Sequence, residues 1–254
     1  MSSYSLRFLD SGLAVGESAT KAERKQGRVM YLRVPNFLND QNLKLVDELI
    51  TSGQFTDGAA TTGGPTKAAK KNLQVDFSQH PKRDQFLQMI TSTVNSNPVT
   101  RSASLPRRLT YPLLSKYEAG MSYGWHIDNP IMSAVGGLLR TDISCTVFIS
   151  DSSDYEGGEL IVRTSSGDAR VKLERGDAFI YPSTSRHQVL EVTSGERLAV
   201  VFWIQSMVAD ASKREILHEL GVAYDRVLKE TPESEALQSI QRTQTNLLRR
   251  WSQI

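Results

Sequence analysis

The sequence has a single cysteine, no long apolar run and almost no net charge, and each of these excludes a class of protein. Cys145 has no partner within the 254 residues, so an intrachain disulfide framework is excluded. No apolar stretch approaches the roughly 18 residues that cross a bilayer, and residues 1–30 lack the apolar core of a signal peptide. The 30 basic and 28 acidic residues leave a net charge of +2, too small to indicate nucleic acid binding. We therefore expect a cytoplasmic protein with neither a membrane nor a nucleic acid partner.

The composition, 39% hydrophobic and 23% charged, is that of an ordinary globular chain. Residues 1–28 show no periodicity and are predicted to be a flexible N-terminal arm. Apolar spacing predicts a helix from Asn39 or Asp40 to about Ser52, and a second from about residue 81 to 96. Between them, residues 56–70 are rich in Gly, Thr and Ala, which predicts a long loop.

From Leu109 to Gln205 the pattern becomes β. Short runs rich in Val, Ile, Phe and Tyr alternate with turn signals such as EGGE, SSGD, ERGD and TSGE. Seven or eight such strands predict a mainly β fold with flanking helices (α+β), a sandwich or jelly roll. Residues 208–254 return to helical spacing, with one apolar stripe from Ile216 to Leu228 and another from Leu237 to Trp251. These helices could cover a sheet or form a homodimer interface, and the sequence leaves both open.

The chain has four histidines, and two of them lie in polar surroundings. His80 precedes a proline in a polar stretch, and His218 lies among charged neighbours in a predicted helix. Both are interpreted as ordinary surface residues. His126 differs because it belongs to YGWHIDNP, where positions i and i+2 of an extended segment point the same way. The imidazole of His126 and the carboxylate of Asp128 would therefore converge.

His187 supplies a second imidazole after an apolar strand and a polar turn, GDAFIYPSTSRH. Two histidines and one carboxylate from separate strands are the ligands that hold non-haem Fe(II) in a facial triad. On spacing alone, two alternatives remain. His126 and Asp128 could form a structural hydrogen-bonded pair while His187 caps a turn, or the same ligands could hold a catalytic zinc ion.

Several motifs, taken in order and spacing, resemble the PKHD-type hydroxylases of the prolyl 4-hydroxylase-like branch of the Fe(II)/2-oxoglutarate-dependent dioxygenases. They are KNLQV, YEAGMSYGWHIDNP, TDISCTVFIS, YEGGEL, GDAFIYPSTSRH and GERLAVVFWIQSMV, followed by the C-terminal helices through NLLRRW. The resemblance covers residues 29–254, and the arm before Met30 looks like an extension of it. Each motif alone is unspecific, whereas the ordered set is specific.

The resemblance implies a double-stranded β-helix over residues 29–207 and a set of functional residues. His126, Asp128 and His187 would bind Fe(II), and Arg197 would bind the distal carboxylate of 2-oxoglutarate. A guanidinium pairs with a carboxylate through two hydrogen bonds and stays charged. Without the resemblance, Arg197 would be interpreted as an exposed residue at a strand end. Tyr117 matches a tyrosine of the co-substrate pocket, with ordinary strand packing as its alternative.

The implied reaction uses 2-oxoglutarate and O2, releases succinate and CO2, and hydroxylates a C–H bond of a prolyl residue in a protein or peptide, or of a small molecule. L-Ascorbate is the expected auxiliary reductant. Period two places Trp203 on the inward face with Arg197, as pocket wall or core. Asn72 and Gln74 share one face and are candidates for substrate contact, while Cys145 is expected to be a small buried hydrophobe. The segment 56–70 is a candidate lid.

Two other functions compete with the dioxygenase. A non-catalytic jelly roll could bind iron or 2-oxoglutarate as a sensor, although Arg197 beside an intact triad disfavours a degenerate module. A hydrolytic zinc enzyme is weaker, because the motif holds no nearby general base. Release of succinate separates the dioxygenase from both.

Overall fold

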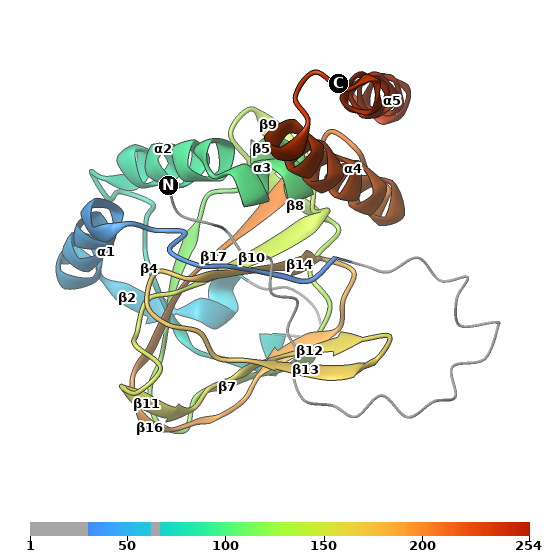
Figure 1. The fold of residues 1–254 in the computed structure, drawn as a ribbon. Helices are drawn as coiled ribbons and strands as arrows, with labels where there is room; N and C mark the ends of the chain where they lie inside the picture. Colours follow the sequence, from blue (N-terminus) through green and yellow to red (C-terminus); the bar gives the residue numbers. More distant parts are fainter. Residues whose placement is uncertain (1–29, 62–66) are drawn as a thin grey trace.

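Two antiparallel sheets form the centre of the computed structural model, which describes residues 30–61 and 67–254 (Figure 1). The larger sheet has the order β1-β14-β10-β17-β6-β4-β2, and β5 also pairs with β17. Its strands are β1 (Leu32–Val34), β2 (Phe55–Asp57), β4 (Leu73–Val75), β5 (Pro106–Leu109), β6 (Leu113–Tyr117), β10 (Ile143–Phe148), β14 (Ala178–Pro182) and β17 (Arg197–Ser206).

The smaller sheet has the order β13-β12-β15-β7-β3. Its strands are β3 (Lys70–Lys71), β7 (Ser122–His126), β12 (Leu160–Thr164), β13 (Gly167–Val171) and β15 (His187–Val189). Two short pairs complete the β structure: β8 (Ile131–Ala134) with β9 (Gly137–Arg140), and β11 (Tyr155–Gly157) with β16 (Val192–Gly195). All these pairings are antiparallel, in agreement with the predicted jelly roll.

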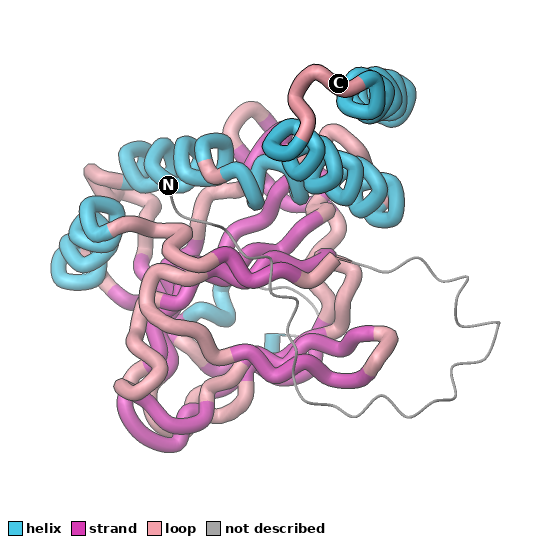
Figure 2. The backbone as a smooth tube through the Cα atoms, viewed as in Figure 1, coloured by secondary structure: helices cyan, strands magenta, loops and turns pink. Residues whose placement is uncertain are grey.

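Helices cover the outer face of the large sheet (Figures 1 and 2). They are α1 (Asp40–Ser52), α2 (Arg83–Ser96) and α3 (Pro98–Ser104). The prediction of α1 is confirmed, because Asn39 accepts a hydrogen bond from the Asn42 N–H and so caps the helix. Buried side chains of these helices, including Leu49, Phe86 and Ile90, pack with Val200 and Phe202 of β17. This apolar layer is the main core.

A second, smaller core lies between the two sheets. Phe148 and Phe179 of the large sheet pack there with Leu160, Val162 and Val189 of the small sheet. Because side chains alternate across a strand, residues of one strand contribute to both cores. This alternation decides which side chains of β10 and β17 face the helices and which face the space between the sheets.

The segment 56–70 is less irregular than the sequence predicts. Phe55–Asp57 forms β2 because it pairs with β4, and a 3-10 helix, η2 (Gly58–Thr61), follows it. Lys70–Lys71 forms β3 beside β7. The predicted long loop is therefore wrong at both of its ends. Residues 62–66 and the predicted arm over 1–28 lie outside the described residues.

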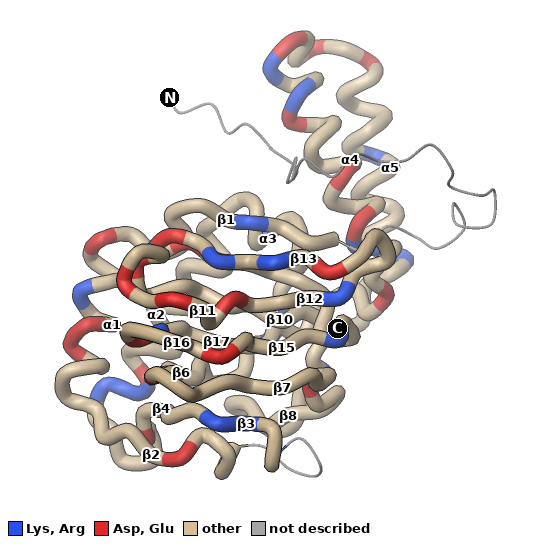
Figure 3. Tube along the Cα trace, turned by 90° about the horizontal axis from the view of Figure 1, so that it is seen from below, with Lys and Arg blue, Asp and Glu red and all other residues tan. Residues whose placement is uncertain are grey.

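The C-terminal helices α4 (Ala211–Glu230) and α5 (Glu235–Trp251) pack against each other and project beyond the sheets (Figure 3). The predicted α4 stripe is partly wrong, since Ile216 and Leu228 are exposed. His218 is buried instead and lies 2.8 Å from Ser102 Oγ of α3, which corrects its interpretation as a surface residue. No helix of the described residues is long and apolar enough to span a bilayer. A domain division at residue 208 stays a prediction.

Candidate metal and co-substrate site

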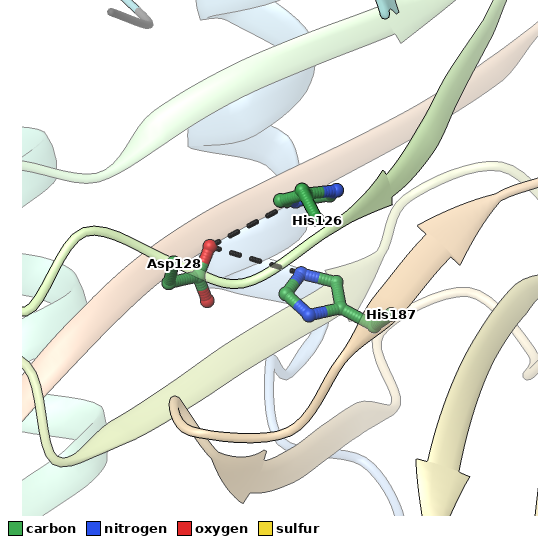
Figure 4. A group of neighbouring side chains, drawn as sticks. All are labelled: His126, Asp128 and His187. Carbon is green, nitrogen blue, oxygen red and sulfur yellow. Dashed lines mark ion pairs between the residues drawn. The ribbon is translucent and has the colours of Figure 1, made fainter. Parts of the chain in front are cut away.

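His126, Asp128 and His187 come together between the sheets. His126 ends β7 and His187 begins β15, and the two are opposite each other in the antiparallel register. Asp128 Oδ1 lies 3.9 Å from His126 Nε2 and 3.7 Å from His187 Nε2 (Figure 4). One ligand atom from each of the three residues lies within 4.8 Å of the other two, so the cluster could hold one divalent ion.

Hydrogen bonds to Nδ1 of each histidine and to Oδ2 of Asp128 orient the three side chains. They leave Nε2 of each histidine and Oδ1 of Asp128 facing one another. His126 Nδ1 is 2.8 Å from the Gly124 carbonyl oxygen, and His187 Nδ1 is 2.9 Å from that of Ser185. A protonated Nδ1 that donates to a carbonyl leaves the Nε2 lone pair free for a metal. The Ser144 hydroxyl donates to Asp128 Oδ2 at 2.5 Å, which leaves Oδ1 for the same ion.

The separations also exclude a structural pair as the reason for this arrangement. At 3.9 Å, His126 and Asp128 are too far apart for a hydrogen bond. Burial, and then the neighbouring His187, lower the pKa of His126, so its imidazole is neutral at neutral pH. Neutral imidazoles and a carboxylate are a ligand set for Fe(II) or a similar divalent ion.

Arg197 is a buried cation in the same cavity. It begins β17 and is 1% exposed, which excludes the exposed strand end as its interpretation. Its guanidinium lies over the rings of Tyr117 and Phe148, at 5.2 and 5.4 Å. Among the described residues no carboxylate forms an ion pair with it, and its Nε and Nη2 have no hydrogen-bond partner. Burying such a charge is costly unless a ligand supplies the anion.

The EGGE turn shapes the environment of Arg197. Gly158 has φ of +64°, which favours glycine, and a Cβ there would lie 3.0 Å from Arg197 Cδ. Tyr117 is directly opposite Arg197 in the pairing of β6 with β17. Burial raises the pKa of Tyr117 to about 12, so its ring contacts the guanidinium as the neutral phenol.

Comparisons with known proteins identify the family of this chain. The model of the 2OG-Fe(II) oxygenase superfamily matches residues 112–205. A PKHD-type hydroxylase of Shewanella oneidensis is 36% identical over 225 residues, which cover 89% of this chain and all of that protein. Another, from Paraburkholderia phytofirmans, is 39% identical over 228 residues, 88% of this chain and all of that protein.

The chain belongs to the PKHD-type hydroxylases. It is therefore an enzyme, a 2-oxoglutarate-dependent dioxygenase, and the family implies Fe(II) and 2-oxoglutarate. Two solved structures share the fold. A Pseudomonas putida prolyl-4-hydroxylase has a TM-score of 0.50 at 16% identity, covering 70% of this chain and 93% of that one. A 2OG-Fe(II) oxygenase family oxidoreductase of Burkholderia pseudomallei has a TM-score of 0.51 at 16% identity, covering 72% and 86%.

The residues of this PKHD-type hydroxylase fit the implied groups. The three inward-facing ligand atoms suit a divalent ion, and the unpaired guanidinium suits a carboxylate. The cavity that holds them is also lined by Trp203 and Gln74, two of the side chains singled out in the sequence. Asn72 is buried but does not line this cavity, and Cys145 is buried in the main core, as expected.

Three further residues, two that line the cavity and one that contacts Asp128 from behind it, are absent from the sequence interpretation. Ser144 holds Asp128, Tyr181 lies edge-on to His187 at 5.2 Å, and Lys70 is buried beside Tyr123. Period two does not lead from Gln74 to Lys70, because Lys70–Lys71 and Leu73–Val75 form strands of different sheets. Burial lowers the pKa of Lys70 to about 8, against the opposing effect of Asp128 and Asp57.

Proposed function

We propose that this chain hydroxylates a C–H bond of a prolyl residue and couples the reaction to decarboxylation of 2-oxoglutarate. The observation that carries the proposal is Arg197, a fully buried guanidinium without an acidic partner among the described residues, in one cavity with the His-Asp-His cluster. A metal cluster alone would suit many reactions. A second site for a carboxylate beside it suits a metal-bound 2-oxo acid.

In this proposal His126, Asp128 and His187 hold Fe(II) and Arg197 binds the distal carboxylate of 2-oxoglutarate. The bound metal and co-substrate supply the oxidation: one oxygen atom of O2 goes to the substrate carbon, the other to succinate, and CO2 leaves. Ser144 fixes the rotation of the Asp128 carboxylate through its hydrogen bond to Oδ2.

The remaining side chains of the cavity wall bind and orient the substrate, and they exclude water. Leu160, Val189 and Val201 line the cavity with apolar surface, and Tyr117 and Tyr181 line it with buried rings. Burial raises the pKa of both phenols, so neither carries a charge at neutral pH. A dry, rigid wall keeps the reacting C–H bond, rather than solvent, next to the oxidant.

The prolyl substrate is supported by the family membership and by the fold shared with a prolyl-4-hydroxylase. A small-molecule substrate is the outcome to be distinguished from it, since fold and cofactor do not fix the substrate. L-Ascorbate is proposed as the reductant that returns Fe(III) to Fe(II) after turnover without substrate.

The test is turnover with Fe(II), 2-oxoglutarate, ascorbate and proline-containing peptides. Substrate-dependent succinate and a product heavier by one oxygen atom are expected from the wild type and not from His187→Ala. Succinate without an oxidised peptide would redirect the search to small molecules. No succinate under any condition, together with tightly held zinc, would contradict the dioxygenase.

A further inference from the structure

We propose that Lys70 binds a carboxylate of the substrate beside the reacting C–H bond; this inference rests on the proposed function. Lys70 is 7% exposed and lines the cavity of the metal cluster. It lies in β3, at the edge of the small sheet beside β7, where Figure 3 shows Lys70–Lys71 in blue.

Stacked rings connect Lys70 to the metal cluster. In the register of β3 with β7, Lys70 is opposite Tyr123, and its Nζ lies 5.4 Å from the centre of that ring. The Tyr123 ring in turn stacks on His126, with centroids 3.6 Å apart. The ammonium is therefore one aromatic ring away from a proposed metal ligand.

Hydrogen bonds hold this ammonium without neutralising it. Nζ donates to Thr61 Oγ1 at 2.8 Å, and Thr61 Oγ1 lies 2.8 Å from Gln74 Oε1. Gln74 Nε2 donates to Ser115 Oγ at 3.1 Å, which connects this series of hydrogen bonds to the large sheet. All these partners are neutral, so they orient Lys70 but leave its charge uncompensated.

No acidic side chain of the described residues forms an ion pair with Lys70. The two carboxylates that act on it through space are Asp128 and Asp57. Asp128 belongs to the metal cluster, and Asp57 is exposed and accepts a hydrogen bond from the Ala59 N–H. In the proposed function, 2-oxoglutarate supplies the anion for Arg197 and, with Asp128, balances the divalent ion. The charge of Lys70 remains for the substrate.

The unmatched hydrogen-bonding groups of the cavity also indicate a carboxylate. Trp203 lines the cavity too, and its buried Nε1 has no acceptor among the described residues. An ammonium and an indole N–H are both donors, and a carboxylate is an acceptor with two oxygens. The source is either the substrate's own α-carboxylate or an acidic side chain next to the prolyl residue.

The test measures equilibrium binding of matched probes to the full chain loaded with Zn(II) and 2-oxoglutarate, which cannot turn over. N-acetyl-L-proline and its amide differ in an α-carboxylate, and N-acetyl-Pro-Glu-amide and N-acetyl-Pro-Gln-amide differ in a side-chain carboxylate. We expect one carboxylate probe to bind about 10- to 100-fold more tightly than its neutral partner. Which pair shows the difference identifies the source of the carboxylate.

Variants of the adjacent residues Lys70 and Lys71 then test whether Lys70 causes this preference for a carboxylate. Lys70→Gln should remove the discrimination between the two probes of that pair, and Lys70→Arg should retain most of it. Lys71→Gln is the matched control, because Lys71 is the neighbouring lysine of β3 and is exposed. It should leave both affinities unchanged.

Three results would overturn the inference. The first is that neither carboxylate probe binds the wild type better than its neutral partner, and the second is that Lys70→Gln keeps the discrimination. The third is that Lys70→Gln weakens 2-oxoglutarate binding by the same factor as probe binding, because Lys70 would then hold the co-substrate. Failure of the wild type to bind 2-oxoglutarate would contradict the proposed function itself, and it is measured separately, before any probe is added.

Discussion

The two faces of the large sheet carry different kinds of side chain, although the faces alternate along the same strands. On β10, Cys145 and Val147 point to the helices, whereas Ser144 and Thr146 point to the space between the sheets. The helix face is a closed apolar core. The inner face carries hydroxyl groups, aromatic rings and a buried cation.

The same division continues on β17. Val200, Phe202 and Ile204 belong to the main core, and Arg197 and Trp203 line the cavity. One face thus stabilises the fold, while the other keeps hydrogen-bonding groups and charge unmatched until ligands bind. Changes on the helix face should therefore lower stability, and changes on the inner face should lower binding and turnover.

The largest effect is expected for Asp128→Ala. Removal of the only acidic side chain of the metal cluster should lower substrate-dependent succinate formation by more than about 100-fold, since even partners of metal ligands contribute about 10- to 100-fold. Ile127→Ala is the control, because the neighbouring Ile127 is 56% exposed. Equal activity of both variants would contradict the assignment of the cluster.

Phe202→Ala tests the helix face. Deleting a fully buried phenylalanine from the main core should cost about 3–5 kcal/mol in the free energy of unfolding. The measurement is denaturant unfolding, with the affinity for 2-oxoglutarate determined below the transition. A changed affinity in the folded fraction would show that the two faces are not independent.

Arg197→Met tests the inner face at its buried charge. The dissociation constant of 2-oxoglutarate should rise by about 100-fold, because a bidentate, charge-assisted pair is lost. The unfolding temperature of the ligand-free protein should not fall, since the variant removes an unpaired buried cation. A large loss of stability with unchanged 2-oxoglutarate binding would reverse the role given to Arg197.

The smallest effects are expected for Ser144 and Cys145, two neighbouring residues of β10 whose side chains lie on opposite faces of the large sheet. Ser144→Ala should weaken Fe(II) binding by about 10-fold, because Asp128 loses the hydrogen bond that orients it. Cys145→Ala should lower stability by about 1 kcal/mol through a small cavity and leave iron affinity unchanged. Iron titration and thermal unfolding of both variants provide the comparison, and similar iron affinities would contradict it.

Local signals in the sequence predict much of this fold. The helix α1 is correct because its cap and apolar spacing are local. The central strands β10, β14 and β17 are correct because Val, Ile, Phe and Tyr recur in them between turn signals. His218 is misjudged because its burial depends on α3, which is more than 100 residues away. The sequence around His218 shows only its charged neighbours.

The sequence predicts the candidate site to a similar extent. His126, Asp128, His187 and Arg197 occupy one cavity, as the motifs predict, although their roles remain proposals. Lys70 was missed because its burial arises from the pairing of β3 with β7, some fifty residues apart. Its importance follows from tertiary pairing, which spacing along the chain does not reveal.

The most direct test of the central claim is an anaerobic titration with Fe(II) and 2-oxoglutarate, followed at the visible metal-to-ligand charge-transfer band. The wild type should show the band at saturation, and His187→Ala should not. Absence of the band from the wild type, with tightly bound zinc or no metal, would contradict a metal and co-substrate site between the sheets.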